Sequence, residues 1–278
     1  MVEIGVGDFW MIEINRFEDV TQIKLSREMN GKPLYWAAAY LVDGLLIDTG
    51  PSHTAEELVK FLEGKGIKFA VNTHFHEDHV GANSLLQHRL GIKIFAHPKA
   101  VPLISEVPKL LPYQELVWGY PKPTQVSPIP NNIKTDSFNF EIVETPGHTQ
   151  DHIALVEREK GWCFTGDLFV TEKPKAFRPA EDVLEIIGSM RKLVGLPTDR
   201  LILFTGIGRI VKDGRVALQS CADYLEDLSR KVKNLAEKGL SVSAIREELI
   251  GEDTSLAILT DGDFSAENLI KSILRSKK

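Results

Sequence analysis

The chain has 278 residues, which is enough for one large domain with a substantial core, or for a domain with an appendage. Its hydrophobic content of 43% and charged content of 26% exclude a disordered chain, and no apolar run is long enough to cross a bilayer. The net charge of -6 disfavours a protein whose whole surface binds nucleic acid, although a local basic groove is compatible with it.

The first 48 residues predict an antiparallel sheet of neighbouring strands. Apolar and β-branched runs alternate with turn signals, and Asn30-Gly31 and Asp43-Gly44 are pairs that favour tight hairpin turns. The predicted strands cover residues 9–14, 21–26, 35–42 and 45–48.

Residues 51–96 predict alternating helices and strands. Pro51 leads into a helix in which Thr54 and Glu57 have the spacing of a capping box. An apolar strand ending at Thr73 follows, and then come a helix over 80–90 and a strand over 92–96. This order is typical of an α/β arrangement.

Four potential metal ligands fall within six residues, in the loop His74-Phe-His-Glu-Asp-His79. Zinc and iron readily accept neutral imidazole and carboxylate where thiolates are absent, and sites that keep an open position are the catalytic ones. His74 and His76 lie on one face of an extended segment, so both can reach one ion. A turn after them would direct Asp78 and His79 elsewhere. The loop therefore predicts a metal centre that has room for two neighbouring sites.

The segment 98–130 differs from its surroundings. Its prolines prevent a long helix or a central strand, and we expect an insertion that lies beside the metal loop. Tyr113, Trp118 and Tyr120 in this insertion are candidates to line a substrate pocket. A packed surface flap explains the same residues equally well.

Strand signals return in the second half of the chain. An amphipathic helix over 181–194 lies among them, because its apolar residues recur at helical spacing. The predicted strands cover residues 138–144, 152–157, 162–165 and 200–205.

The end of the chain predicts helices only. A helix over 216–237 has one apolar stripe, which could pair with a second copy of the chain in a homodimer or pack within its own domain. Shorter helices are expected over 243–250 and 265–275. We therefore expect a main domain over 1–238 and a small helical appendage over 239–278.

Four short strings stand at the ends of predicted strands. They are His-x-His-x-Asp-His at 74–79, Leu-Ile-Asp-Thr-Gly at 46–50, Thr-Pro-Gly-His-Thr at 145–149 and Thr-Gly-Asp at 165–167. In their order along the chain, 46–50, 74–79, 145–149 and 165–167, they resemble the motifs of the metallo-β-lactamase superfamily, whose members include glyoxalase II and lactonases. The resemblance implies an α/β fold, an αββα four-layer sandwich with the metal centre at one edge between two sheets, here with a C-terminal helical appendage.

The resemblance also implies a role for each ligand. His148 would complete a first site with His74 and His76. Asp167 would bridge two ions, because a carboxylate has two oxygens with separate lone pairs. Asp78 and His79, the remaining members of the first string, would belong to the second site.

Three further positions stand out against the family pattern. Asp48 would support the cluster by orienting a ligand or a nearby loop, and His152 is a supporting residue, a substrate contact or an ordinary polar strand residue. The last ligand of the family, a histidine between two glycines, is replaced here by Ile207. Because isoleucine cannot bind an ion, three outcomes are open: two ions of unequal affinity, one ion, or a replacement ligand such as His152. We expect unequal affinity.

The function that the resemblance implies is metal-dependent hydrolysis. Zinc-activated hydroxide would attack an ester, thioester or lactone of a small molecule, with one or two Zn²⁺ ions as cofactor and iron or manganese as alternatives. Asp78 and Asp167 are the catalytic candidates, and Asp78 could orient the water or shuttle a proton. Two other hypotheses are a phosphodiesterase or nuclease of the same fold, and a metal-binding or partner-binding protein whose catalysis is weakened at Ile207.

The cysteines and the first residues indicate a compartment. Cys163 and Cys221 are the only cysteines, and the sequence is compatible with a disulfide between them. We expect two buried free thiols instead, which fits the reducing cytoplasm. The first eight residues lack the basic and apolar regions of a secretion signal. We therefore expect a cytoplasmic protein with a small-molecule substrate and no membrane partner.

Overall fold

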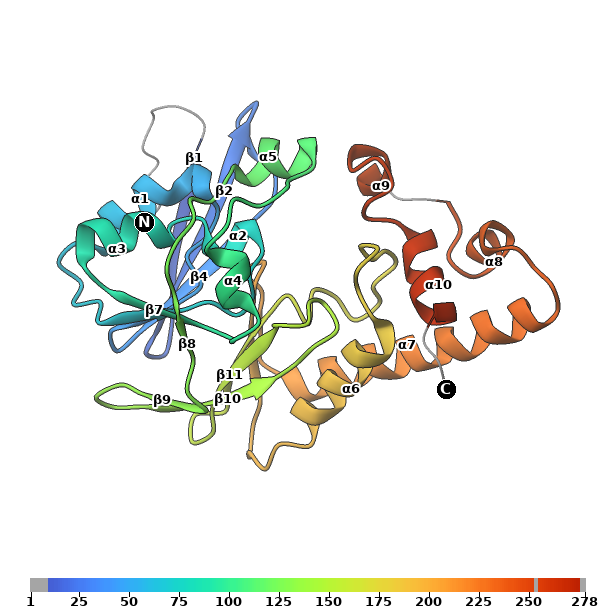
Figure 1. Ribbon diagram of the computed structural model, residues 1–278. Helices are drawn as coiled ribbons and strands as arrows, with labels where there is room; N and C mark the ends of the chain where they lie inside the picture. Colours follow the sequence, from blue (N-terminus) through green and yellow to red (C-terminus); the bar gives the residue numbers. More distant parts are fainter. Residues whose placement is uncertain (1–9, 253–254, 276–278) are drawn as a thin grey trace.

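The computed structural model describes residues 10–252 and 255–275, and its strands form two sheets with helices outside them (Figure 1). The order of the first sheet is β1-β2-β4-β5-β6-β7-β8, with β3 paired to β2. Its strands are β1 (Trp10–Phe17), β2 (Val20–Met29), β3 (Lys32–Pro33), β4 (Ala37–Val42), β5 (Leu45–Ile47), β6 (Phe69–Val71), β7 (Lys93–Ala96) and β8 (Ser127–Pro128). Phe9, the predicted start of the first strand, lies outside the described residues.

The second sheet has the order β14-β13-β12-β11-β10-β9. Its strands are β9 (Asn132–Lys134), β10 (Asn139–Glu144), β11 (Ile153–Glu157), β12 (Trp162–Gly166), β13 (Ile202–Thr205) and β14 (Ile210–Val211). In each sheet, antiparallel pairs stand beside parallel ones: β5, β6 and β7 run parallel, and so do β12 and β13.

The hairpin turns form where the sequence predicts them. Asn30 and Gly31 have φ angles of 55° and 75°, and Asp43 and Gly44 have φ angles of 47° and 81°. Two successive positive φ values give a turn whose twist matches that of the flanking strands, and Asn, Asp and Gly adopt such values at little cost.

The layered arrangement follows from the alternation of side chains along each strand. Leu45 and Ile47 of β5 point into a core between the two sheets, whereas Leu46 points to a second core on the outer face of the first sheet. Strand β11 alternates in the same way between the central core and a third core outside the second sheet. Three cores separate four layers, and the fold is therefore the expected αββα sandwich.

Helices cover both outer faces (Figure 1). Apolar residues of α1 and α3 pack in the core outside the first sheet, and those of α6 and α7 pack in the core outside the second sheet. The helices are η1 (Ser52–Thr54), α1 (Ala55–Leu62), α2 (Glu77–Val80), α3 (Asn83–Leu90), α4 (Ala100–Ile104), α5 (Pro112–Trp118), α6 (Val183–Val194), α7 (Gly214–Glu237), α8 (Val242–Leu249), α9 (Ser255–Leu259) and α10 (Ala266–Arg275). Among the described residues, none of these helices has the length and apolar character to span a membrane.

The capping box predicted at the start of α1 is wrong. The hydroxyl of Thr54 donates to the carbonyl of Pro51 at 3.2 Å and makes no capping hydrogen bond to α1. Thr54 is the last residue of η1, which runs directly into α1. The hydroxyl is therefore engaged in the turn before α1 and is not available to cap the N-terminus of α1.

The apolar stripe of α7 is buried within the chain. Leu218, Leu225 and Val232 pack in the same core as α6 and as apolar residues of α8 and α10. Figure 1 shows α7 extending beyond the sheets, with α8 and α10 beside its outer half. This stripe is therefore covered and does not provide a dimer surface. The domain boundary at residue 238 stays a prediction, because helices on both sides of it share one core.

The insertion over 98–130 contains the short helices α4 and α5 and the two-residue strand β8. The side chain of Gln114 in α5 donates to Glu77 at 2.8 Å, so the insertion contacts the metal loop. The hydroxyl of Tyr113 donates to Oδ2 of Asp263, between α9 and α10, at 2.6 Å. The insertion thus links the first sheet to the C-terminal helices.

Candidate metal centre

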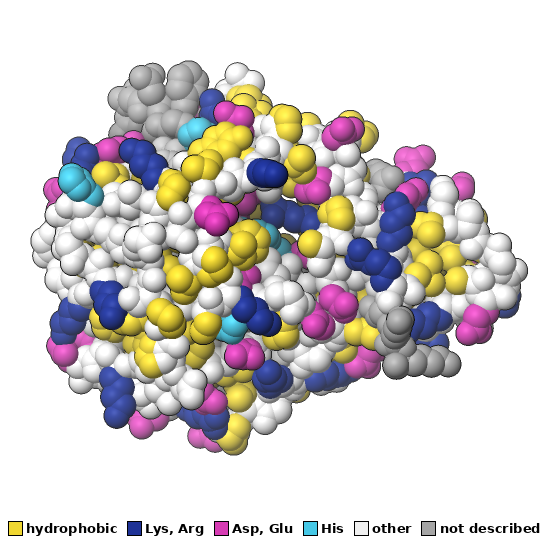
Figure 2. Space-filling view, in the orientation of Figure 1, with side chains coloured by type: hydrophobic (Ala, Val, Ile, Leu, Met, Phe, Trp, Pro, Cys, Tyr) yellow, Lys and Arg dark blue, Asp and Glu magenta, His cyan; other side chains and the backbone are white. Residues whose placement is uncertain are grey.

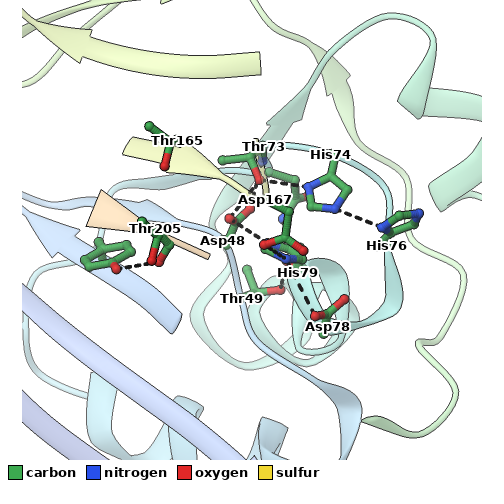
Figure 3. Close-up of polar contacts among 12 residues, drawn as sticks. Asp48, Thr49, Thr73, His74, His76, Asp78, His79, Thr165, Asp167 and Thr205 are labelled. Atoms are coloured by element: carbon green, nitrogen blue, oxygen red, sulfur yellow. Dashed lines mark hydrogen bonds and ion pairs between the residues drawn. The ribbon is translucent and has the colours of Figure 1, made fainter. Parts of the chain in front are cut away.

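The predicted ligands meet where strands of both sheets end. Asp48 follows β5, and the His74 loop follows β6, which runs parallel to β5. His148 follows β10 and Asp167 follows β12, and these two strands run in the same direction because each pairs antiparallel with β11. Figure 3 shows the side chains from both sheets directed toward one another.

The first ligand group consists of His74, His76 and His148. Nε2 of His74 and Nε2 of His148 each lie 3.0 Å from Nδ1 of His76. Nitrogens bound tetrahedrally to one zinc ion at about 2.05 Å stand roughly 3.3 Å apart. The three nitrogens therefore converge closely enough to hold one divalent ion.

Oxygen atoms behind two of these rings leave the inward nitrogens free. Nδ1 of His148 donates to Oε1 of Glu181 at 2.5 Å, and Nδ1 of His74 donates to Oγ1 of Thr73 at 3.1 Å. The hydroxyl of Thr73 donates in turn to Asp48 at 2.9 Å. With a hydrogen on Nδ1, each ring keeps its lone pair on Nε2, the atom that faces the other ligands.

The second group is built around His79 in α2. Its Nδ1 donates to Oδ2 of Asp48 at 2.8 Å, and its Nε2 lies 3.4 Å from Oδ1 of Asp167 and 3.7 Å from Oδ2 of Asp78. Although burial lowers the pKa of His79, these three carboxylates raise it well above its usual value. The pocket therefore has a surplus of negative charge that a cation would balance.

Several buried atoms of the second group have no hydrogen-bond partner. Among the described residues, Nε2 of His79, Oδ1 of Asp78 and Oδ1 of Asp167 are buried and unpaired. Unpaired buried polar atoms are costly and rare, so they indicate a bound species that the atoms coordinate. The donor atoms of the second group thus fit a divalent cation.

Asp167 lies between the two groups. Its Oδ1 is 3.4 Å from Nε2 of His79, and its Oδ2 is 3.7 Å from Nε2 of His148. Each carboxylate oxygen therefore faces one ligand group. This arrangement fits the bridging role that the sequence predicts for Asp167.

Burial shapes the charge of the remaining ligands. Burial and the neighbouring His79 lower the pKa of His74 well below its usual value, and burial likewise lowers the pKa of His76. Both rings are therefore neutral and have lone pairs to give. Burial raises the pKa of the Asp78 carboxyl to about 6, against the opposing effect of His79. Asp78 thus exchanges a proton closer to neutral pH than an exposed carboxyl does.

The backbone after β13 comes very close to the second group. A Cβ atom built on Gly206 would lie 2.1 Å from Oδ1 of Asp167 and 2.8 Å from Cε1 of His79. Glycine is required at this position because any side chain would fill the space beside the carboxylate. The next residue is the half-buried Ile207, and among the described residues no ligand outside the predicted set joins the two groups.

His152 does not take the place of the metal-binding histidine that the family has at the position of Ile207. Its Nδ1 lies 2.8 Å from Oγ1 of Thr145, and its Nε2 accepts a hydrogen bond from the backbone N–H of Asp167 at 3.2 Å. Burial lowers the pKa of His152 to about 3, so the ring is neutral. His152 thus holds the backbone of Asp167 in place with both ring nitrogens engaged.

Aromatic side chains and one arginine stand beside the first group. The ring centroid of Trp118 is 5.7 Å from that of Tyr35 and 6.0 Å from that of Tyr113, and Cζ of Arg178 lies 5.7 Å from the Trp118 ring. Trp118 is buried in this stack, whereas Tyr120 is 43% exposed and has no ring contact among the described residues. Tyr113 and Trp118 therefore belong to an aromatic wall beside Arg178, and the role of Tyr113, Trp118 and Tyr120 in binding a substrate stays a prediction.

Sequence reasoning missed Thr73, Arg178 and Glu181. Thr73 directly precedes the first ligand, and that position is the only signal that could have found it. Glu181 lies 33 residues from His148, its partner, at the expected start of a helix, where an acidic residue needs no further explanation. Arg178 lies in a segment to which the sequence assigns no element.

Comparison with known proteins finds a matching family model and several similar proteins. The model of the metallo-β-lactamase superfamily matches residues 37–205. The hydroxyacylglutathione hydrolase GloC of Haemophilus influenzae is 34% identical over 175 residues, which cover 59% of this chain and 81% of that protein. The probable metallo-hydrolase MJ0888 of Methanocaldococcus jannaschii is 30% identical over 195 residues, which cover 63% of this chain and 89% of that protein.

A solved structure matches as well. The crystal structure of TTHA1623 in a di-iron-bound form has a TM-score of 0.53 and 25% sequence identity, and the match covers 67% of this chain and 94% of that one. The matched family region contains every residue of the two ligand groups.

Proposed function

Because the chain belongs to the metallo-β-lactamase superfamily of metal-dependent hydrolases, we propose that it hydrolyses a small acyl thioester. The observation that carries the proposal is the pair of ligand groups that face opposite oxygens of Asp167. The choice of a thioester among esters, thioesters and lactones is supported by the similarity to GloC, whose name gives a hydroxyacylglutathione as its substrate.

The proposed cofactor is zinc, in one tight and one weaker site. A divalent cation in these groups supplies Lewis-acid polarisation of a carbonyl and makes hydroxide available from water near neutral pH. His74, His76 and His148 would hold the tight ion. Asp78, His79 and Asp167 would hold the weaker one, because the chain has Ile207 where the family has a fourth ligand.

The side chains of the centre would transfer a proton and hold the ligand groups in position. Asp78 is buried beside His79, and its carboxylate oxygen that does not bind the ion would accept a proton from the attacking water and return it to the leaving thiolate. Asp167 would keep the two ligand groups at a fixed separation. His152 would hold Asp167 through its backbone N–H.

A substrate panel tests this proposal. Purified protein with its metal would be assayed against a hydroxyacylglutathione, a simple ester, a lactone and bis(p-nitrophenyl) phosphate. We expect the thioester to be hydrolysed with the highest kcat/KM, and we expect removal of the metal with a chelator to abolish the rate until zinc, iron or manganese is returned. The variant His74→Ala, folded by circular dichroism, is expected to lose the activity because a ligand of the tight ion is gone.

Other results would contradict the proposal in distinct ways. Preference for the phosphodiester, together with salt-sensitive RNA or DNA binding, would identify a nuclease. A metal-loaded protein that hydrolyses none of the four compounds would instead favour a binding function.

A further inference from the structure

Arg178 stands at the rim of the first ligand group. It lies between β12 and α6, its side chain is 16% exposed, and NH1 of its guanidinium lies 3.4 Å from Nδ1 of His76. In the space-filling view, basic and histidine side chains are visible inside a hollow in the middle of the molecule (Figure 2). A cation on the protein itself is thus held directly beside the ligands of a metal ion.

Among the described residues, the guanidinium has only long contacts to acceptors. Among the described residues, its nearest carboxylate oxygen is Oε1 of Glu77, 3.9 Å from NH2, and that oxygen already accepts a hydrogen bond from Gln114 at 2.8 Å. Nδ1 of His76 faces the nitrogens of the other two histidines, so its lone pair is the one that a metal ion would take. With the ion bound, the guanidinium keeps the long ion pair with Glu77 as its recorded carboxylate contact among the described residues.

A second donor in the same wall is also unpaired. Nε1 of Trp118 is buried and has no hydrogen-bond partner among the described residues, and the Trp118 ring lies against the guanidinium of Arg178. A buried cation whose counter-ion is distant and a buried N–H without an acceptor are unfavourable unless a ligand supplies closer acceptors. A guanidinium presents a planar fork of N–H donors that matches a carboxylate, which can accept two parallel hydrogen bonds.

We propose that Arg178 recognises a carboxylate on the substrate, and that the enzyme prefers acyl thioesters with a carboxylate a few bonds from the scissile carbonyl. The position follows from geometry: NH1 lies 3.4 Å from a ligand nitrogen, so a carboxylate bound to it lies next to the reacting carbonyl. The recognised carboxylate therefore belongs to the acyl group and not to the far end of the thiol leaving group. This inference rests on the proposed thioesterase function and adds the charge of the acyl group.

Two thioesters of matched shape test the inference. The succinyl and 4-methylpentanoyl thioesters of N-acetylcysteamine differ in that a carboxylate in one replaces an isopropyl group in the other. For Arg178→Met we expect the KM of the succinyl thioester to rise about 10- to 100-fold, as for loss of hydrogen bonds to a charged group. The KM of the neutral thioester is expected to stay within about twofold. Arg191→Met, which removes a half-buried arginine of α6 that pairs with Asp223 outside the metal centre, is the matched control and leaves both values unchanged.

Binding gives a readout that does not depend on turnover. The thioether S-(3-carboxypropyl)-N-acetylcysteamine cannot be hydrolysed, and its affinity for the metal-loaded protein can be measured by calorimetry. We expect Arg178→Met to weaken it by at least about tenfold. Arg178→Lys is expected to weaken it less, because lysine keeps the charge but not the fork. If Arg178→Met does not fold, the lysine variant decides, since it must raise only the KM of the succinyl compound.

The outcomes separate the two proposals. Equal effects of Arg178→Met on both thioesters, or no effect on either, would overturn the carboxylate site and leave the hydrolase intact. Arginine-dependent binding of the thioether without hydrolysis of any thioester would instead support the site and contradict the proposed function.

Discussion

At the residue scale, oxygens of the chain that hydrogen-bond to the imidazole rings preorganise the metal centre. One ring nitrogen of each of three histidines is bonded to an oxygen of the chain, and the other nitrogen faces a ligand group; the three are His74, His79 and His148. Such bonds fix the orientation of a ring and the nitrogen that carries its hydrogen before an ion arrives. The partner with the shortest of these bonds is Glu181, at 2.5 Å from Nδ1 of His148.

The change Glu181→Ala tests this arrangement. We expect the affinity for the tight ion to fall about 10- to 100-fold, because His148 loses the carboxylate that orients it. Competition with a chromogenic chelator measures the affinity. Glu185→Ala, which removes a half-buried carboxylate four residues further along that has no bond to a ligand histidine among the described residues, is the matched control. An affinity equal to that of the unchanged protein would mean that the Glu181 contact does not support the ligand.

Metal stoichiometry tests the weaker site. After dialysis against a chelator, we expect elemental analysis to find about one ion per chain, and titration with zinc to restore a second. In Gly206→Ala the added Cβ meets Oδ1 of Asp167, so the second ion is expected not to bind while the first remains. Gly188→Ala is the control, because a Cβ there meets nothing within 4 Å. Two ions that survive dialysis would contradict a weak second site.

The sequence reveals ligands that are neighbours in the chain and hides those that are not. Four potential ligand residues within 74–79 predict a metal loop without any knowledge of the fold. Glu181 and Arg178 carry no such signal, because an acidic residue before a helix and an arginine in a loop are ordinary. Only the packing of α6 beside the second sheet brings Glu181 within reach of His148.

At the element scale, α7 joins the second sheet to the helices that follow it. Leu225 in the middle of α7 is fully buried in the core that contains residues of α6, α8 and α10. We expect Leu225→Ala to lower the free energy of unfolding by about 2 to 5 kcal/mol, because it removes buried methyl groups and leaves a cavity. Val216→Ala on the same helix is the control: Val216 is 66% exposed, and its change is expected to cost less than about 0.5 kcal/mol. Urea titration compares the two, and equal losses would contradict the packing of α7.

Elements with strong periodicity could be predicted, and short ones could not. The apolar spacing of α6 and α7 indicates both helices, because an apolar face must meet a core. Strands β9 and β14 have three and two residues, so no period is long enough to detect, and α9 is similarly short. The capping box at Thr54 fails for a related reason: the turn that precedes α1 was not visible in the sequence.

At the scale of the whole molecule, the C-terminal helices contact the segment that carries Arg178 and Glu181, which lie beside the metal centre. The backbones of Phe177 and Ser265 pair through two hydrogen bonds of 3.1 Å, and the hydroxyl of Ser272 in α10 donates to the carbonyl of Glu181 at 2.8 Å. The segment that carries Arg178 and Glu181 is therefore anchored to residues that follow α8. The end of the chain thus fixes side chains that belong to the centre.

Truncation after Lys238 tests how far the main domain depends on this support. We expect the shortened chain to unfold at a clearly lower temperature, because it exposes the buried stripe of α7, and to lose most of the hydrolytic activity because the 168–182 segment is released. Circular dichroism and the thioester assay measure the two effects. A truncated protein that melts and reacts like the full chain would show that residues 1–238 form an independent domain.

The hydrogen bond between Tyr113 and Asp263 has a consequence for building chimaeras. It connects an insertion of the first sheet to the turn before the last helix, 150 positions away in the chain. A chimaera that takes only one of the two segments from a relative loses one partner of this hydrogen bond, and the remaining partner then faces a residue that does not match it. Exchange of substrate preference between relatives therefore requires that both segments be transplanted together.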